Sequence, residues 1–255
     1  MKQSLSVVIT SFDEKLSVFL DALKNSIKNS HPEANILVIG KEIPLEEIEL
    51  LHSLKENYEL PNFSPGCLKT IGWKQGLEMA ITDWILFLDA DMIINKPIYD
   101  YIQWCEDNNV EFVFTWRKAF PEWINTGVML IKKTPETVNF FSNYVRAVIE
   151  GMKENFNDQD TFIKCIARPK IESLEISNCE DRKKIFRFSK SNINFAAISC
   201  DLLNNAKHIE HINANTRILH YKGIMGTLIL KDKKMNRYQY FLDHGIFEYK
   251  LVDLK

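Results

Sequence analysis

The feature that most constrains the fold is the order strand, helix, strand near the amino terminus. Leu5 to Thr10 and Asn35 to Gly40 are short apolar runs typical of buried strands. Between them, from about Glu14 to Ile27, apolar residues recur every three or four positions, which indicates an amphipathic helix. Consecutive parallel strands are joined by right-handed crossovers of this kind, so the sequence predicts an α/β fold with a mixed, mainly parallel sheet flanked by helices. The chain has 255 residues, 45% of them hydrophobic, which suits one large domain.

The same alternation continues to about residue 170. Further helices are expected over residues 45–55, 67–80, 97–109, 136–151 and 158–167, and further strands over 84–88, 110–116, 127–131, 184–188 and 217–221. Beyond residue 170 the hydrophobic periodicity weakens, so an irregular carboxyl-terminal third is expected. No internal repeat or low-complexity tract interrupts the chain.

Charge and cysteine content argue against several classes of protein. The net charge is -2, which does not indicate a nucleic-acid binder. The five cysteines form no Cys-X-X-Cys pair, a pattern typical of reduced thiols. The first apolar run is too short for a signal peptide and no run reaches the roughly 18 residues of a membrane span, so a cytoplasmic protein is expected. The basic and aromatic stretches 182–188 and 231–240 are interpreted as solvated faces, with peripheral contact to an anionic membrane or a lipid-linked acceptor as the alternative.

Two carboxylates stand at the end of the apolar run Trp84 to Leu88. Asp89 and Asp91 are two positions apart, and in an extended backbone such residues point the same way. Side by side they repel each other unless a cation or a proton lies between them. At the carboxyl end of a strand in an α/β sheet, this pair favours a divalent metal that holds a phosphorylated ligand. The alternative is a polar turn that ends a core strand.

Three further polar clusters follow the acidic pair. They are Asn125-Thr126-Gly127 before an apolar strand, Asp158-Gln159-Asp160 at a helix start, and His220-Tyr221-Lys222-Gly223 after Ile218-Leu219. Each has an ordinary structural interpretation: a turn for the first, a helix N-cap for Asp158, and a buried, hydrogen-bonded histidine for His220.

Together the four clusters, in this order, resemble retaining glycosyltransferases of the GT-A fold around family 8. The resemblance is carried by Leu88-Asp89-Ala90-Asp91, by Ile124 to Ile131, by Asp158-Gln159-Asp160 and by His220-Tyr221-Lys222-Gly223, and covers about residues 5 to 225. It implies a single Rossmann-like catalytic domain over residues 1–255, with a nucleotide- and metal-binding half (1–130), an acceptor and sugar half (131–225) and a carboxyl-terminal extension (226–255). It also implies transfer of a sugar from a nucleoside-diphosphate sugar, with uridine as the expected base, to a glycan or lipid-linked acceptor.

The resemblance also assigns roles to residues. Asp89, Asp91 and His220 would hold Mn²⁺ or Mg²⁺, and the imidazole favours Mn²⁺. Asp158 would bind donor sugar hydroxyls, Gln159 would lie against the anomeric carbon, and Asp160 is a second candidate carboxylate for catalysis. The expected cofactor-binding residues are Thr10, Ser11, Lys69, Lys74, Ala90, Asn125, Gly127, Lys222 and Gly223. On one helix Lys69 and Lys74 are five positions apart, so only one of them is expected to reach the ligand, and the alternative for either is a solvated helix face.

Some residues depart from the family 8 pattern. That family continues its histidine motif with a lysine and Pro-Trp, whereas this chain has Ile224-Met225-Gly226-Thr227, and Lys222 is the substitute for the missing charge. Trp73-Lys74-Gln75-Gly76 resembles inverting family 2 enzymes. A haloacid dehalogenase-type phosphatase would also end a strand with two aspartates, but Met92-Ile93-Ile94 after the acidic pair disfavours it. A non-catalytic module that binds sugar nucleotides stays open.

Overall fold

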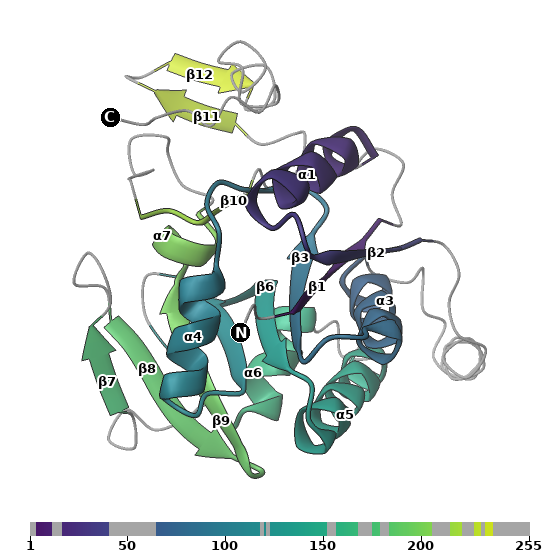
Figure 1. The fold of residues 1–255 in the computed structure, drawn as a ribbon, viewed down its shortest axis with the longest axis vertical. Coiled ribbons are helices and arrows are strands. Elements are labelled where there is room, and N and C mark those ends of the chain that lie inside the picture. Colours follow the sequence, from purple (N-terminus) through teal and green to yellow (C-terminus); the bar gives the residue numbers. More distant parts are fainter. Residues whose placement is uncertain are drawn as a thin grey trace.

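An eight-stranded mixed sheet forms the centre of the molecule in the computed structural model (Figure 1). The structure describes residues 4–11, 17–40, 65–117, 120, 123–151, 157–167, 175–178, 184–205, 215–220, 227–230 and 233–236. In the order β2-β1-β3-β6-β5-β9-β8-β7, the strands are β2 (Asn35–Ile39), β1 (Leu5–Thr10), β3 (Trp84–Asp89), β6 (Ile124–Lys132), β5 (Phe112–Trp116), β9 (Ile193–Ser199), β8 (Lys184–Lys190) and β7 (Glu175–Asn178). Pairing is parallel between β1 and β2, β1 and β3, and β5 and β9, and antiparallel at the other junctions.

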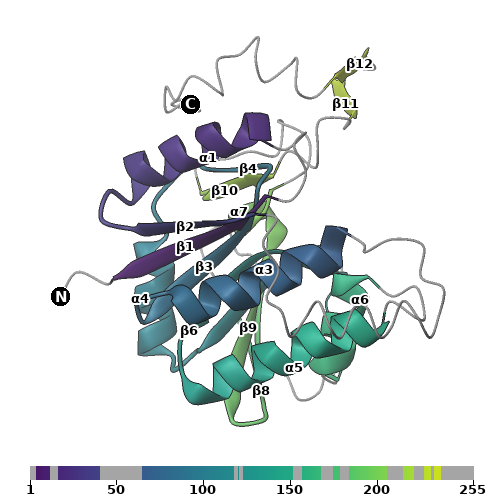
Figure 2. The same cartoon turned by 90° about the vertical axis from the view of Figure 1, so that its right-hand side faces the viewer.

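Helices cover both faces of this sheet (Figure 2). The first face packs against α3 (Pro65–Met79), α5 (Pro135–Gly151) and α6 (Asp158–Cys165), and the second against α1 (Ser17–Ser30) and α4 (Tyr99–Asp107). Successive side chains of β3 point to opposite faces of the sheet. Ile85 and Phe87 pack on the first face, and Leu86 and Leu88 pack on the second. A strand buried on both faces reads as a continuous apolar run, which explains the sequence of β3.

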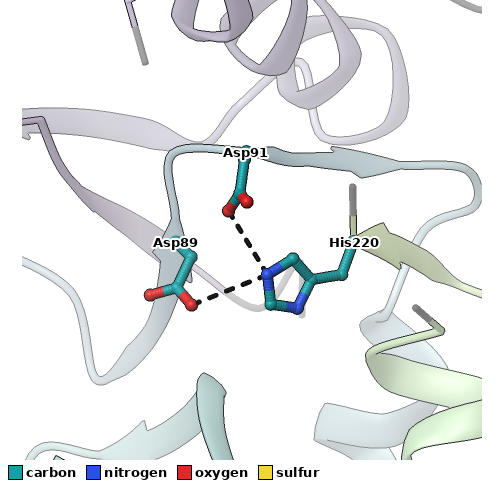
Figure 3. Close-up of side chains that lie close together, drawn as sticks. All are labelled: Asp89, Asp91 and His220. Carbon is teal, nitrogen blue, oxygen red and sulfur yellow. Dashed lines mark ion pairs between the residues drawn. The ribbon is translucent and has the colours of Figure 1, made fainter. Parts of the chain in front are cut away.

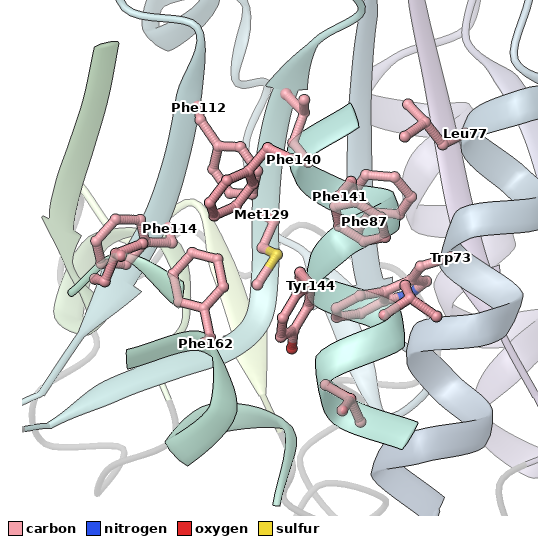
Figure 4. Packing of buried hydrophobic residues seen from close by; sticks show 14 of the residues in the cluster. Trp73, Leu77, Phe87, Phe112, Phe114, Met129, Phe140, Phe141, Tyr144 and Phe162 are labelled. Atoms are coloured by element: carbon pink, nitrogen blue, oxygen red, sulfur yellow. The ribbon is translucent and has the colours of Figure 1, made fainter. Parts of the chain in front are cut away.

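Aromatic rings fill the core beneath α3, α5 and α6 (Figure 4). Phe87 and Phe141 stack with ring centroids 5.2 Å apart, and Phe162 meets Phe114 edge-on at 5.1 Å. Gly76 lets α3 lie against β1, because a Cβ atom there would overlap Cγ1 of Val8. This packing fixes the position of α3, which carries one residue of the candidate site.

Three segments meet at the carboxyl end of β3. Because β6 is antiparallel to β3, the start of β6 lies beside the end of β3. The short strand β4 (Met92–Ile94) follows β3 and pairs antiparallel with β10 (Ile218–His220), which comes after α7 (Cys200–Leu203). A second small sheet joins β11 (Thr227–Leu230) and β12 (Lys233–Asn236). The carboxyl end of β3 is therefore bordered by residues from the middle and the end of the chain.

Most of the expected elements are confirmed, including β1, β2, β3, β5, α4, α5, α6 and β8. The helix expected over residues 45–55 lies outside the described residues. The strand β9, in the interior of the sheet, has no counterpart among the expected elements. The prediction of an irregular segment at residues 193–199 is therefore wrong. None of the helices in the described part of the chain has the length and hydrophobicity that a bilayer-crossing segment needs.

Candidate active site

Two carboxylates and one imidazole converge at the end of β3 (Figure 3). Asp89 is the last residue of β3, Asp91 precedes β4, and His220 ends β10. The Nε2 atom of His220 lies 3.3 Å from Oδ1 of Asp91 and 3.9 Å from Oδ2 of Asp89. One ligand atom from each of the three residues lies within 4.8 Å of the others. The acidic pair and the downstream histidine therefore share one site.

Backbone pairing brings His220 to the acidic pair. In the β4–β10 ladder, His220 is opposite Met92, the residue that follows Asp91. The His220 backbone N–H also donates a 2.9 Å hydrogen bond to the carbonyl of Asn205. The backbone of β10, which carries the imidazole, is thus held by β4 on one side and by Asn205 on the other.

Lys69 of α3 joins the acidic pair to a third carboxylate. Its Nζ atom lies 2.7 Å from Oδ2 of Asp158 and 3.3 Å from Oδ1 of Asp89. Burial alone would lower the pKa of Lys69, but the charges of Asp89 and Asp158 outweigh it and raise this pKa above its usual range. Lys69 is therefore a fixed positive charge between the end of β3 and the start of α6.

Asp158 begins α6 but does not cap it. The N-cap is Asn157, whose side chain accepts a hydrogen bond from the backbone N–H of Asp160, so the interpretation of Asp158 as an N-cap is wrong. The Asp158 carboxylate instead accepts a hydrogen bond from Oγ1 of Thr126 and pairs with Lys69. Burial acts to raise the pKa of Asp158, and Lys69 and Thr126 together lower it below its usual value.

An irregularity in β6 places Thr126 and Gly127 at the site. The β5–β6 register shifts between Phe114 and Thr115, so these two β6 residues have no partner in that ladder. Gly127 was expected in this strand and Thr126 lies in it as well, so the alternative interpretation as a turn before the strand is wrong. A Cβ atom on Gly127 would be 2.6 Å from Oδ2 of Asp89, so the glycine leaves room for that carboxylate. Bulges of this kind often occur beside active sites.

Asn125 lies beneath the site rather than at its surface. Its side chain is only 4% exposed, and its Oδ1 accepts hydrogen bonds from the backbone N–H of Gly127 and from Nδ2 of Asn204. The Oδ1 atom of Asn204 in turn lies 2.8 Å from Nδ1 of His220. Asn204, which ends α7, was not among the expected site residues.

Four of the remaining expected residues lie at the end of β1, after β3 or on α3: Thr10, Ser11, Ala90 and Lys74. Thr10 is opposite Asp89 in the β1–β3 ladder, and Ser11 follows it at the same edge, where its N–H donates to Ile39. Ala90 is buried between the two aspartates. Lys74 pairs with Glu78 along α3 at 3.8 Å, so Lys69 is the lysine that reaches the carboxylates.

In the same turn of α6 as Asp158, Gln159 is partly buried and Asp160 is exposed. Lys222 and Gly223 lie outside the described residues, so the expected phosphate contacts there stay predictions.

The donor set fits a divalent cation. Carboxylate oxygens suit Mg²⁺ and Mn²⁺, and an imidazole nitrogen favours a transition metal. Asp91 and His220 are largely buried, with side chains 9% and 8% exposed, and Gly127 leaves a space beside Asp89 that any side chain would fill. Two carboxylates in so confined a place favour a cation between them.

Comparisons with known proteins agree on the fold. No protein-family model and no curated protein matches the sequence. A crystal structure of a glycosyltransferase involved in the glycosylation of the major capsid of PBCV-1 is similar, with 15% identity, a TM-score of 0.56, and coverage of 86% of this chain and 95% of that one. The glycosyltransferase GlyE of Streptococcus pneumoniae TIGR4, in two structures of which one is the apo form, has 14% identity and a TM-score of 0.53. That match covers 94% of this chain, which spans 60% of the GlyE chain. The mixed α/β fold of this chain is therefore one that glycosyltransferases adopt.

Proposed function

We propose that this protein is a metal-dependent glycosyltransferase that moves a sugar from a nucleoside-diphosphate sugar to an acceptor hydroxyl. The observation that carries the proposal is the convergence of Asp89, Asp91 and His220 at the carboxyl end of β3, in a fold shared with glycosyltransferases. Ligands of open α/β sheets bind at this edge. A single catalytic domain, a uridine base and a glycan or lipid-linked acceptor belong to the same proposal, and rest on the motif resemblance.

Each residue of the site has a task in this reaction. Asp89, Asp91 and His220 would hold Mn²⁺ or Mg²⁺, whose charge stabilises the nucleoside diphosphate as it leaves. Lys69 holds Asp89 and Asp158 in place and offsets part of their negative charge. Thr10 and Ser11 lie at the sheet edge next to Asp89, where the nucleoside would bind.

Retention of the anomeric configuration is part of the proposal. An inverting enzyme needs a carboxylate that takes a proton from the acceptor hydroxyl. Asp158 is poorly suited to this task, because its pKa is lowered and Lys69 and Thr126 occupy its Oδ2 atom. We assign it to binding donor hydroxyls beside Gln159. Proton NMR of the first-formed sugar product tests this assignment, and an inverted anomer would assign the base role to a carboxylate such as Asp160, as in a family 2-like reaction.

Isothermal titration with UDP tests the metal site directly. In the wild type, Mn²⁺ is expected to strengthen UDP binding by roughly tenfold or more, since an ion contact to a diphosphate contributes more than about 1.4 kcal/mol. Asp91→Asn is expected to remove this enhancement. Asp83→Asn is the matched control, because Asp83 is exposed and precedes the other end of β3. Equal UDP binding with and without Mn²⁺ in all three proteins would reject the site.

The same proteins distinguish a transferase from a phosphatase or a binding module. A thermal-shift panel of nucleoside diphosphates and sugar nucleotides, with and without Mn²⁺, identifies the base and the sugar. A transferase is expected to hydrolyse its donor slowly when no acceptor is present, and Asp91→Asn is expected to lose this activity. A binding module would hold the nucleotide without hydrolysing the donor, and a phosphatase would release phosphate from an aryl phosphate.

A further inference from the structure

We infer that Asn204 is a positioning residue that keeps the proton of the neutral His220 ring on Nδ1, so that Nε2, which faces the acidic pair, has a lone pair. The inference deepens the proposed function and rests on it for the role of the cation. Asn204 is fully buried at the end of α7, and its Oδ1 atom lies 2.8 Å from Nδ1 of His220. Of the three residues proposed to hold the cation, it hydrogen-bonds His220.

Two neighbours fix the orientation of the Asn204 amide. The backbone N–H of Gly127 donates to the side chain of Asn125 at 2.9 Å, so the Asn125 atom in that contact is its oxygen. The same oxygen lies 2.6 Å from the Asn204 side chain, which must therefore present its NH₂ group there. The Thr115 hydroxyl donates its one hydrogen to the backbone carbonyl of Asn125 at 2.9 Å. Toward Asn204 the hydroxyl oxygen can therefore only accept, and it accepts from Nδ2 at 2.9 Å. Both N–H groups of Asn204 are used, and its oxygen is left to face His220.

This orientation assigns the proton of the imidazole. An amide oxygen only accepts, so Nδ1 of His220 carries a proton. In the neutral ring the other nitrogen, Nε2, then has a lone pair, and it is Nε2 that faces Asp91 and Asp89. The two carboxylates on their own favour a proton on Nε2, which would block coordination. Asn204 thus acts against them and keeps the lone pair directed at the cation site.

Burial makes the reversed arrangement costly. A reversed Asn204 amide would bring two oxygens, its own and that of Asn125, to 2.6 Å from each other. Thr115 and Asn204 are completely buried and Asn125 is 4% exposed. Bulk water therefore has little access to replace the hydrogen bonds that the reversed amide would lose. The hydrogen bonds from Gly127 to Asn204 therefore form one locked chain that ends at the imidazole.

The test compares three variants in the metal-free and the Mn²⁺-loaded protein. Asn204→Leu removes the acceptor for Nδ1, whereas Asn204→Asp keeps an oxygen there and, as the neutral acid that burial favours, can still donate to Oδ1 of Asn125. Thr137→Val is the control, because Thr137 is also buried and hydrogen-bonded but lies beyond the far end of β6, where its hydroxyl donates to Lys132. Long-range ¹H–¹⁵N NMR spectra of the ring nitrogens report the tautomer of His220, which is assigned with His220→Gln. Titration calorimetry reports Mn²⁺ affinity, and circular dichroism verifies folding.

In the neutral ring of the wild type, of Asn204→Asp and of Thr137→Val, the proton is expected on Nδ1. In Asn204→Leu it is expected on Nε2, with Mn²⁺ affinity reduced roughly 10- to 100-fold, the usual effect of removing a hydrogen-bond partner of a ligating histidine. A proton on Nε2 in the wild type overturns the inference, as does an unchanged tautomer in a folded Asn204→Leu protein. If Asn204→Leu does not fold, the wild-type spectrum still decides the question, because it shows directly which ring nitrogen carries the proton. Because the spectra need no metal, this result is independent of whether Mn²⁺ strengthens UDP binding.

Discussion

Gly127 offers a sharp perturbation of the proposed cation site. In Gly127→Ala the new Cβ atom would be 2.6 Å from Oδ2 of Asp89, 2.8 Å from Cε of Met92 and 2.9 Å from Oδ1 of Asn125. Ordinary contact begins near 3.4 Å, so the carboxylate oxygen must move by about 0.8 Å. Metal–ligand distances are held to within about 0.2 Å, so a shift of this size takes Asp89 out of coordination. We expect a stability loss of about 1–3 kcal/mol from overpacking and at least tenfold weaker Mn²⁺-dependent UDP binding.

Two other glycine variants serve as controls, because they distinguish a general loss of stability from the loss of the cation site. In Gly76→Ala the Cβ atom would overlap Cγ1 of Val8, so this variant is expected to lose stability through strain between α3 and β1 but to keep Mn²⁺ affinity. In Gly40→Ala nothing lies within 4 Å of the new atom, so neither property is expected to change. Urea denaturation measures stability, and titration calorimetry with UDP and Mn²⁺ measures binding.

The three results together decide whether Asp89 is a ligand. Wild-type Mn²⁺-dependent binding in a folded Gly127→Ala protein would refute the reasoning, because Asp89 could not then keep its place. Equal losses of binding in Gly127→Ala and Gly76→Ala would also refute it, because general destabilisation would explain both.

Three further predictions concern buried titratable groups. Lys69→Met leaves the carboxylates beside it without a counter-charge and is expected to cost about 3 kcal/mol in urea denaturation. Lys74→Met breaks a longer, 3.8 Å pair with Glu78, whose side chain is 55% exposed, and is expected to cost less than about 1 kcal/mol, so similar losses would contradict the role given to Lys69. Burial lowers the pKa of His31 to about 4, so the unfolded chain takes up this proton first, and stability is expected to fall by about 3 kcal/mol from pH 6.5 to pH 4. His31→Gln is expected to flatten that pH dependence, and an unchanged slope would contradict the assignment. Burial raises the pKa of Cys67 to about 12, so peptide mass spectrometry is expected to find this thiol unmodified by iodoacetamide at pH 8 until the protein unfolds; modification in the native protein would contradict its burial.

The sequence predicts those parts of the fold that local patterns encode. β1 and β3 are apolar runs, and α5 begins at Pro135 in a segment with helical periodicity. β9 is as buried as these strands, but alanines dilute its apolar run and the turn before it is Ser191-Asn192. Both turn residues have positive φ, 52° and 61°, yet neither is a glycine, so the usual sign of a hairpin is absent.

The candidate site is predictable only where a motif carries it. The Asp-X-Asp motif marks Asp89 and Asp91, but β3 ends at Asp89 and Asp91 lies in the turn before β4, so that turn, and not a continuous extended backbone, brings the two carboxylates together. Asn157 and Asp158 are equally good caps by residue type, and the choice between them depends on Lys69, a residue distant in sequence that takes Asp158 as its partner. The role of Asn204 depends on hydrogen bonds from three other elements, and no local pattern marks it.

The ladder between β4 and β10 is only three residues long, yet it closes a loop of more than one hundred residues between Asp91 and His220. Closing so long a loop costs entropy that the short ladder must offset together with the contacts around it. An ion bound by Asp89 and Asp91 on one side of that junction and by His220 on the other would hold the two ends of this loop together. We therefore expect the melting temperature to rise with Mn²⁺ concentration. When the ion is chelated, β10 is expected to be the first of these strands to open.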